Sequence, residues 1–173
     1  PCLDKKNNVT ITEPYNKTFI KNLRTKRKYH STLKLYLSKK LKFEEFSTEI
    51  FKKKFDLIVI ALSLAGIDFI GRELKKLKVK TPILVLTKGL KYDKKKDKIL
   101  TISELFKKNY NLTNVSVLKG PCLAKELARK NKTSVVVANK NINTAKWIGN
   151  KISTKYYQTE FSRDDIGVEI SSA

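Results

Sequence analysis

Hydrophobic residues in this chain gather into short runs that alternate with amphipathic stretches. The clearest run, residues 55–62, is apolar except for Asp56, as in a parallel strand that is covered on both faces. Shorter runs of apolar and β-branched residues predict further strands at 82–86, 114–118 and 133–138. Apolar residues at helical spacing predict helices at 65–77, 97–108, 121–130 and 141–150.

The two ends of the chain extend this alternation. The N-terminal pattern predicts a strand at 9–12, a helix at 17–28, an irregular polar stretch at 29–42, a short strand from 42–43 and a short helix at 46–54. A last short strand is predicted at 155–159. Strands that alternate with helices throughout predict an α/β fold with a doubly wound, mainly parallel sheet and right-handed crossovers.

Composition narrows the class of protein. The 173 residues suffice for one domain with a core, and a hydrophobic content of 40% argues against disorder. No apolar run is long enough to span a bilayer, so we expect no membrane partner. The two cysteines, Cys2 and Cys122, are far apart and lack metal-ligand spacing, so we expect no metal site and a cytoplasmic location.

Charge suggests a second class of function. The chain has 38 basic and 16 acidic side chains, and its net charge of +22 first points to nucleic acid. Only five of the basic residues are arginine, whose planar fork suits phosphates and base edges. The lysines are spread along the chain, so we expect a solvated basic surface with no specific nucleic-acid partner. A basic nucleic-acid-binding α/β module remains an alternative.

A lysine follows one of the predicted strands directly. Thr87-Lys88-Gly89 comes after the apolar run 82–86, and ligands of open α/β sheets bind beyond the carboxyl ends of strands. Gly89 allows a ligand to approach the backbone closely, and the Lys88 ammonium can donate to a phosphate or a polarised oxygen. A lysine at a strand end can also be merely solvated.

A second strand end carries small residues. Gly120 comes before the helix predicted at 121–130 and Cys122 lies in its first turn, which would offer free N–H groups to an anion. Pro121 suits the first turn of a helix, and a helix N-terminus would lower the pKa of the Cys122 thiol. His30, the single histidine, lies far away in an irregular polar stretch, so we do not expect it to act as the base for a nucleophilic cysteine.

An acidic residue follows the first predicted strand. Glu13 comes directly after 9–12, and an acidic residue at the end of the second strand of a dinucleotide-binding fold typically binds the ribose 2′-hydroxyl. This position favours NAD over NADP, although NADP remains possible. A surface glutamate is the alternative interpretation.

Four stretches together resemble the NAD(P)-dependent glycerol-3-phosphate dehydrogenase family. Thr87-Lys88-Gly89-Leu90 looks like the family's Thr-Lys-Gly-Leu/Ile-Glu motif, and 120–128 is similar to its Gly-Pro-Ser/Thr-Phe-Ala-Lys-Glu-Val/Leu-Ala motif. The strand at 56–61 resembles the one before the family's Val-Pro-Ser turn, and 164–173 resembles its Asp-x-x-Gly-Val-Glu-x-x-Gly-Ala segment. The likeness runs through nearly the whole chain in the same order.

The resemblance implies a fold, an activity and a set of site residues. Residues 1–160 would form a Rossmann-type cofactor domain, and 161–173 would begin a helical substrate domain. The protein would interconvert sn-glycerol 3-phosphate and dihydroxyacetone phosphate by hydride transfer with NAD(P), as a homodimer. Lys88 would contact both substrate and cofactor. Gly120 and Cys122 would line the substrate site, and Ala124 would touch the cofactor.

The chain also departs from the family pattern. The glycine-rich loop and the first strand are absent, Cys122 replaces a serine or threonine, and Leu62-Ser63 lacks the family's proline. A lysine follows Leu90 where the family has glutamate. The expected proton-transferring lysine lies beyond Ala173, so we expect this chain to be inactive alone. Another hydroxyacid dehydrogenase of the same architecture is the second enzymatic interpretation.

Overall fold

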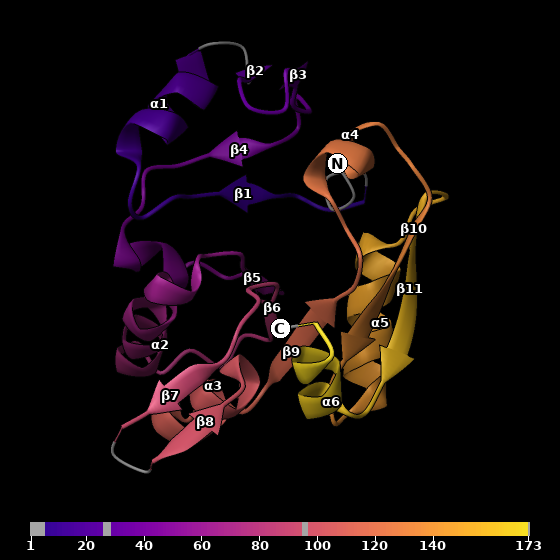
Figure 1. Ribbon diagram of the computed structural model, residues 1–173. Helices are drawn as coiled ribbons and strands as arrows, with labels where there is room; N and C mark the ends of the chain where they lie inside the picture. The colour runs from indigo at the N-terminus through magenta and orange to yellow at the C-terminus, as the bar shows by residue number, and fades with distance from the viewer. Residues whose placement is uncertain (1–5, 26–28, 95–96, 173) are drawn as a thin grey trace.

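A five-stranded sheet forms the centre of the computed structural model, which describes residues 6–25, 29–94 and 97–172 (Figure 1). Its strand order is β11-β10-β9-β6-β5. The strands are β5 (Ile58–Ile60), β6 (Ile83–Val85), β9 (Val115–Lys119), β10 (Thr133–Ala138) and β11 (Tyr157–Ser162). All neighbouring pairs in this sheet are parallel except β9 and β10, which are antiparallel. The predicted α/β fold with a mainly parallel sheet is confirmed.

Helices cover both faces of this sheet, which explains the continuous apolar runs. Alternate residues of a strand point to opposite faces. Ile83 and Val85 pack into one core with α2 (Ile67–Lys76) and α3 (Ile102–Tyr110). Leu84 packs into a second core with α5 (Ile142–Ile152). Figure 1 shows α2 and α3 on one side of the sheet and α5 on the other.

The N-terminal part has a small core of its own. Strand β1 (Thr10–Ile11) pairs in parallel with β4 (Lys42–Phe43), and α1 (Lys17–Thr25) packs against them through Ile20 and Leu23. The described residues contain no ladder between this pair and the five-stranded sheet, so the expected doubly wound sheet is divided here. The last three residues of the helix predicted at 17–28 lie outside the described part.

Several predicted boundaries are wrong. The helix predicted at 97–108 begins only at Ile102, because β8 (Lys98–Leu100) forms a hairpin with β7 (Lys91–Asp93) and Thr101 starts α3 with a capping box. The stretch 29–42, expected to be irregular, contains the hairpin of β2 (Tyr29–His30) and β3 (Leu35–Tyr36). The helix at 46–54 is the 3-10 turn η2 (Thr48–Lys52), and η3 (Leu64–Gly66) leads into α2.

The helix predicted at 121–130 is much shorter than expected. Helix α4 spans only Ala124–Ala128, because Leu123 before it has an extended backbone. Pro121 and Cys122 therefore lie in a connecting loop and not in a first helical turn. None of the described helices is long and apolar enough to cross a membrane.

Helix α6 (Asp165–Ile170) is fixed to α3 through two buried carboxylates. Glu169 accepts hydrogen bonds from the N–H groups of Ile102 at 3.2 Å and Ser103 at 3.0 Å. Asp165 forms an ion pair with Lys107. A carboxylate at a helix N-terminus meets free N–H groups and a favourable dipole. These contacts determine where the last described residues of the chain lie.

Candidate active site

Three parallel strands of the central sheet end at the same edge. Strands β5, β6 and β9 run in the same direction, and Leu62, Thr87 and Lys119 lie at or just beyond their carboxyl ends. The Thr87 hydroxyl donates to the Leu62 carbonyl oxygen at 2.7 Å, and Lys119 Nζ donates to the Thr87 carbonyl oxygen. Side chains therefore connect the three strand ends at the edge where ligands of α/β sheets bind.

The turn after β6 presents Lys88 to the outside. Thr87 is buried, whereas Lys88 directly after it is exposed. Gly89 follows with φ of +108°, a conformation that residues with a Cβ rarely adopt. The buried Thr87 therefore holds the backbone in place before Lys88, and Gly89 allows the chain to turn sharply after it.

The exit from β9 depends on Gly120. Its φ is +150°, and an added Cβ would lie 3.0 Å from the Cα of Val135 and 3.1 Å from the carbonyl oxygen of Ser134. The chain therefore passes directly against β10, and a larger residue would push the two strands apart.

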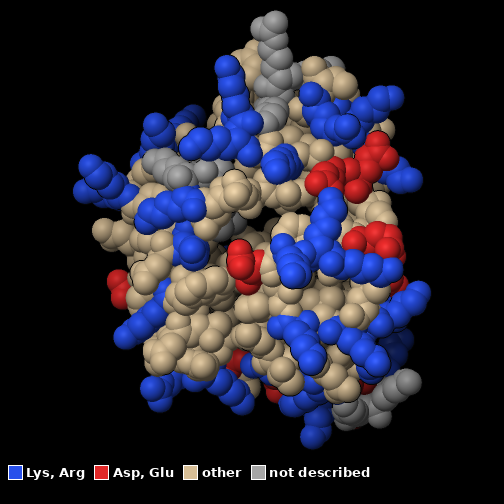
Figure 2. Space-filling model, turned by 180° about the vertical axis from the view of Figure 1, so that it is seen from behind, with Lys and Arg blue, Asp and Glu red and all other residues tan. Residues whose placement is uncertain are grey.

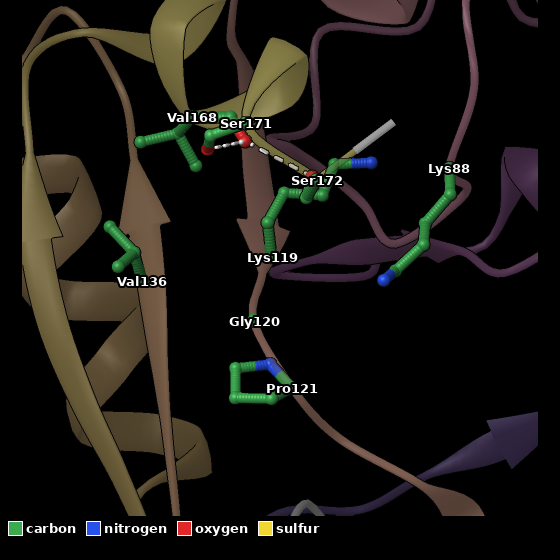
Figure 3. Close-up of a pocket in the computed structure, with 8 residues that line it drawn as sticks. All are labelled: Lys88, Lys119, Gly120, Pro121, Val136, Val168, Ser171 and Ser172. Carbon is green, nitrogen blue, oxygen red and sulfur yellow. Dashed lines mark hydrogen bonds between the residues drawn. The ribbon is translucent and has the colours of Figure 1, made fainter.

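A pocket of about 430 Å³ lies at this edge of the sheet. It is lined by Lys88, Lys119, Gly120, Pro121, Val136, Val168, Ser171 and Ser172 (Figure 3). Figure 3 shows the Lys119 side chain extending from the end of β9 toward the segment that carries Lys88, with the Lys88 side chain on the same side of β9. The predicted site residues Lys88 and Gly120 are thus brought together, and helix α6 with the residues after it forms the opposite wall.

Lys119 is the charged residue of this pocket that the sequence pattern did not reveal. Its side chain lies at the end of β9 and the residue is only 4% exposed. Burial lowers the pKa of the Lys119 ammonium, the Glu169 carboxylate acts to raise it, and the positive charge of Lys88 lowers it further. The sequence does show a charged residue between the predicted strand 114–118 and Gly120. Because the strand was predicted to end at residue 118, Lys119 was expected to lie beyond it.

The serines of the pocket wall are held by the backbone of α6. Ser171 Oγ donates to the Val168 carbonyl oxygen at 3.2 Å, and Ser172 Oγ donates to it at 3.1 Å (Figure 3). Sequence analysis did not select these residues, because nothing local places 168–172 beside the ends of β6 and β9. The long-range contact of Glu169 with α3 does so.

The expected low pKa of Cys122 is wrong. Cys122 precedes α4 by two residues and packs against the core that α5 covers. Burial raises the pKa of its thiol, while a hydrogen bond with the Tyr157 side chain and the charge of Lys88 act in the opposite direction. The charge of Lys88 therefore acts on the Cys122 thiol, but the Cys122 side chain is not among those that line the pocket.

The remaining predicted residues lie outside the pocket. Ala124 is exposed at the start of α4. Glu13 lies after β1, where its Oε1 atom accepts the N–H of Tyr15 at 2.8 Å. His30 lies in the β2–β3 hairpin, where Nδ1 accepts the N–H of Leu33 at 3.2 Å.

The described residues also bear on two other classes of site, a metal centre and a nucleic-acid-binding surface. No group of three or more His, Cys, Asp or Glu side chains in residues 6–25, 29–94 and 97–172 could hold a metal ion. On the face shown in Figure 2, lysine and arginine side chains are scattered over the surface and do not gather into one stripe. This distribution is typical of a solvated basic surface.

Comparison with known proteins shows which family this chain belongs to. Residues 2–145 match the family model described as the NAD-dependent glycerol-3-phosphate dehydrogenase N-terminus. The chain is 34% identical over 119 residues to a glycerol-3-phosphate dehydrogenase [NAD(P)+] of Clostridium botulinum, covering 68% of this chain and 34% of the relative. It is 31% identical over 143 residues to that of Leptospira biflexa, covering 80% of this chain and 41% of the relative.

Solved structures show the same fold. The crystal structure of glycerol-3-phosphate dehydrogenase from Coxiella burnetii matches 96% of this chain and 50% of that chain, with a TM-score of 0.80 and 21% identity. The enzyme structure from Plasmodium falciparum matches 95% of this chain and 46% of that one, also with a TM-score of 0.80. The match of the family model over most of the sequence shows that this chain belongs to the NAD-dependent glycerol-3-phosphate dehydrogenase family.

Proposed function

We propose that the protein containing this chain interconverts sn-glycerol 3-phosphate and dihydroxyacetone phosphate with NAD as the hydride carrier. The observation that carries the proposal is the pocket at the carboxyl ends of β6 and β9. There, two lysine side chains and Gly120 meet within the stretch that matches the family. A small anionic substrate suits such a pocket, because cationic donors lie beside a backbone that can be approached closely.

Lys88 is the residue that we assign to the substrate and the cofactor together. Its ammonium is exposed at the mouth of the pocket, where it can donate a hydrogen bond to the substrate oxygen that becomes a carbonyl. A cation in that place stabilises the negative charge that develops on this oxygen during hydride transfer. Gly120 would let the substrate approach the β9 backbone, and Cys122 in the loop that follows would line the substrate site.

The chemistry of two further residues fits a bound dinucleotide. Glu13 uses Oε1 for the Tyr15 N–H, and its Oε2 has no hydrogen bond with the described residues, so it can accept from a ribose hydroxyl. Ala124 is small and exposed, which allows contact with a flat ring. Glu13, Lys88 and Ala124 would hold NAD, which when bound accepts a hydride from the carbon that bears the substrate hydroxyl. The Glu13 carboxylate would repel the additional phosphate of NADP.

The rest of the proposal concerns the protein as a whole. The matched region covers 34% and 41% of the length of the two curated relatives named above. We assign residues 1–160 to the cofactor domain and 161–173 to the start of a helical substrate domain. The protein would act in the cytoplasm as a homodimer.

A steady-state assay of the complete gene product tests the proposal. We expect NADH formation with sn-glycerol 3-phosphate, and a higher kcat/KM with NAD than with NADP. Glycerol is the matched control substrate, because it lacks only the phosphate. Activity confined to another α- or β-hydroxyacid would contradict the substrate and favour a different dehydrogenase of this architecture.

A further inference from the structure

Lys119 is a buried lysine at the end of a strand whose other residues are apolar or small. It ends β9, whose five residues are all buried, and only 4% of its surface is exposed. A buried charge is costly unless opposite charges or hydrogen bonds compensate for it. The partners of Lys119 therefore indicate what this charge is for.

The protein compensates this charge only in part. A lysine ammonium has three N–H donors, and Thr87 O is the one hydrogen-bond acceptor that Lys119 Nζ has among the described residues. The negative charge of Glu169 acts to raise the pKa of Lys119, but both carboxylate oxygens of Glu169 already accept backbone N–H groups of α3. No salt bridge within 4.0 Å joins Lys119 to a described acidic residue.

A second positive charge faces the same space. Lys88 also lines the pocket, and its charge makes the charged form of Lys119 less favourable. The hydroxyl groups of Ser171 and Ser172 on the opposite wall donate to carbonyl oxygens of α6. The two lysines are therefore the charged donors among the residues that line the pocket. Two like charges beside one cavity are stabilised when an anion binds between them.

We propose that Lys119 and Lys88 together form a two-lysine anion site for a small phosphate monoester, in which Lys119 donates to the phosphate group and Lys88 lies between this group and the oxygen on the reacting carbon. Lys119 contributes a buried, directed donor, and its hydrogen bond to Thr87 O fixes the turn that carries Lys88. Lys119 is thus a specificity residue for phosphate as well as a positioning residue for Lys88. The identity of the ester, glycerol 3-phosphate, rests on the proposed function, whereas the affinity for phosphate does not.

Binding of inorganic phosphate to the complete gene product tests this site without turnover. In a two-dimensional amide NMR titration, we expect the resonances of Gly89 and Gly120 to shift. Lys119→Met, which keeps side-chain length and removes the charge, should weaken phosphate binding about tenfold, the effect of losing one charge-assisted hydrogen bond. Lys146→Met removes an equal charge from the exposed face of α5 and should leave the affinity unchanged.

Kinetics and pH separate binding from a purely structural role. Lys119→Met should raise KM for glycerol 3-phosphate by a similar factor with a smaller change in kcat, and should leave the affinity for NAD unchanged. Phosphate affinity of the wild type should fall with rising pH below the ordinary pKa of lysine, since Lys119 loses its proton early. Lys119→Arg, which stays charged, should move this fall to higher pH.

Three results would overturn the inference. Phosphate affinity in Lys119→Met equal to that of the wild type would leave Lys119 as a structural link alone. A loss confined to NAD would assign the anion site to the cofactor's pyrophosphate. If Lys119→Met does not fold, an unchanged pH profile in Lys119→Arg would count against the site. An enzyme that binds phosphate as expected but does not oxidise glycerol 3-phosphate would refute the proposed function and leave this inference standing.

Discussion

The ammonium group of Lys119 donates a hydrogen bond to the carbonyl oxygen of Thr87, so a side chain at the end of β9 holds the backbone that carries Lys88. Thr87 in turn donates its hydroxyl to Leu62 O at the end of β5. Three strands are connected in this way at one edge of the sheet. The turn between Thr87 and Gly89 is therefore a rigid support for Lys88, although Lys88 itself is exposed.

Removal of the Lys88 charge should affect chemistry more than folding. In Lys88→Met we expect kcat/KM for glycerol 3-phosphate to fall by about 10²–10³, since a donor to the developing oxyanion is lost. The free energy of unfolding should hardly change, because the side chain is exposed. Steady-state kinetics and urea unfolding measure the two effects. Lys140→Met, at another exposed position after β10, is the control, and equal losses in both variants would refute the role of Lys88.

A side chain at Gly120 should destabilise the protein and disturb the pocket. In Gly120→Ala the new Cβ meets the backbone of β10 at 3.0–3.1 Å and the φ of +150° becomes strained. We expect a loss of about 1–3 kcal/mol in the free energy of unfolding, measured with urea. Gly66→Ala is the matched control: its φ is −82° and the closest atom is the hydroxyl at the tip of Tyr15. A smaller loss at Gly120 than at Gly66 would contradict this explanation.

Neutralisation of Glu169 should loosen α6 from α3. Glu169→Gln retains the shape of the side chain but replaces one of the two oxygens that accept the N–H groups of Ile102 and Ser103. We expect a loss of about 1–3 kcal/mol in stability, the cost of a buried donor left unsatisfied. Hydrogen exchange should accelerate at these two amides. The same change at exposed Glu160 should alter neither quantity, and unchanged exchange in Glu169→Gln would refute the anchoring role.

The contact between α2 and α3 should make stability depend on pH at both extremes. Tyr110 donates its hydroxyl to Asp68 Oδ1 at 2.8 Å, and Lys91 pairs with the same carboxylate at 2.8 Å. Burial and the Asp68 carboxylate raise the pKa of Tyr110 from 10.0 to about 12. Although burial acts to raise the pKa of Asp68, the hydrogen bonds from Lys91 and Tyr110 lower it overall.

The signs of these shifts determine the direction of each effect. The Tyr110 contribution is complete below its unfolded pKa of about 10 and is lost as pH rises through the folded value of about 12. The Asp68 contribution is complete above its unfolded pKa and is lost as pH falls through the lower folded value. Urea unfolding across pH should show both declines in the wild type. Tyr110→Phe should lack the alkaline decline, and its persistence there would assign it to another group.

Sequence patterns predicted the parts of the site that depend on local order. The runs that became β5, β6 and β9 are apolar because helices cover both faces of the sheet, and this local signal also locates Lys88 and Gly120 at strand ends. The helix expected at Pro121 was wrong, because an extended Leu123 delays α4 until Ala124. The low pKa expected for Cys122 depended on that helix and was wrong with it.

The missed parts depend on contacts between distant residues. Glu169 reaches the N–H groups at the start of α3, more than sixty residues earlier in the chain, and so brings Ser171 and Ser172 to the pocket. Periodicity carries no information on such a contact. The burial of Lys119 also went unrecognised, because a lysine beside a glycine is usually an exposed residue at the end of a strand.

A crystal structure of the complete gene product with bound sn-glycerol 3-phosphate would locate the substrate in this fold. We expect the ligand at the carboxyl ends of β6 and β9, with its oxygen atoms within hydrogen-bonding distance of Lys88 Nζ and Lys119 Nζ. A ligand bound elsewhere in the fold, with neither lysine in contact with it, would refute both the assigned site and the roles of the two lysines.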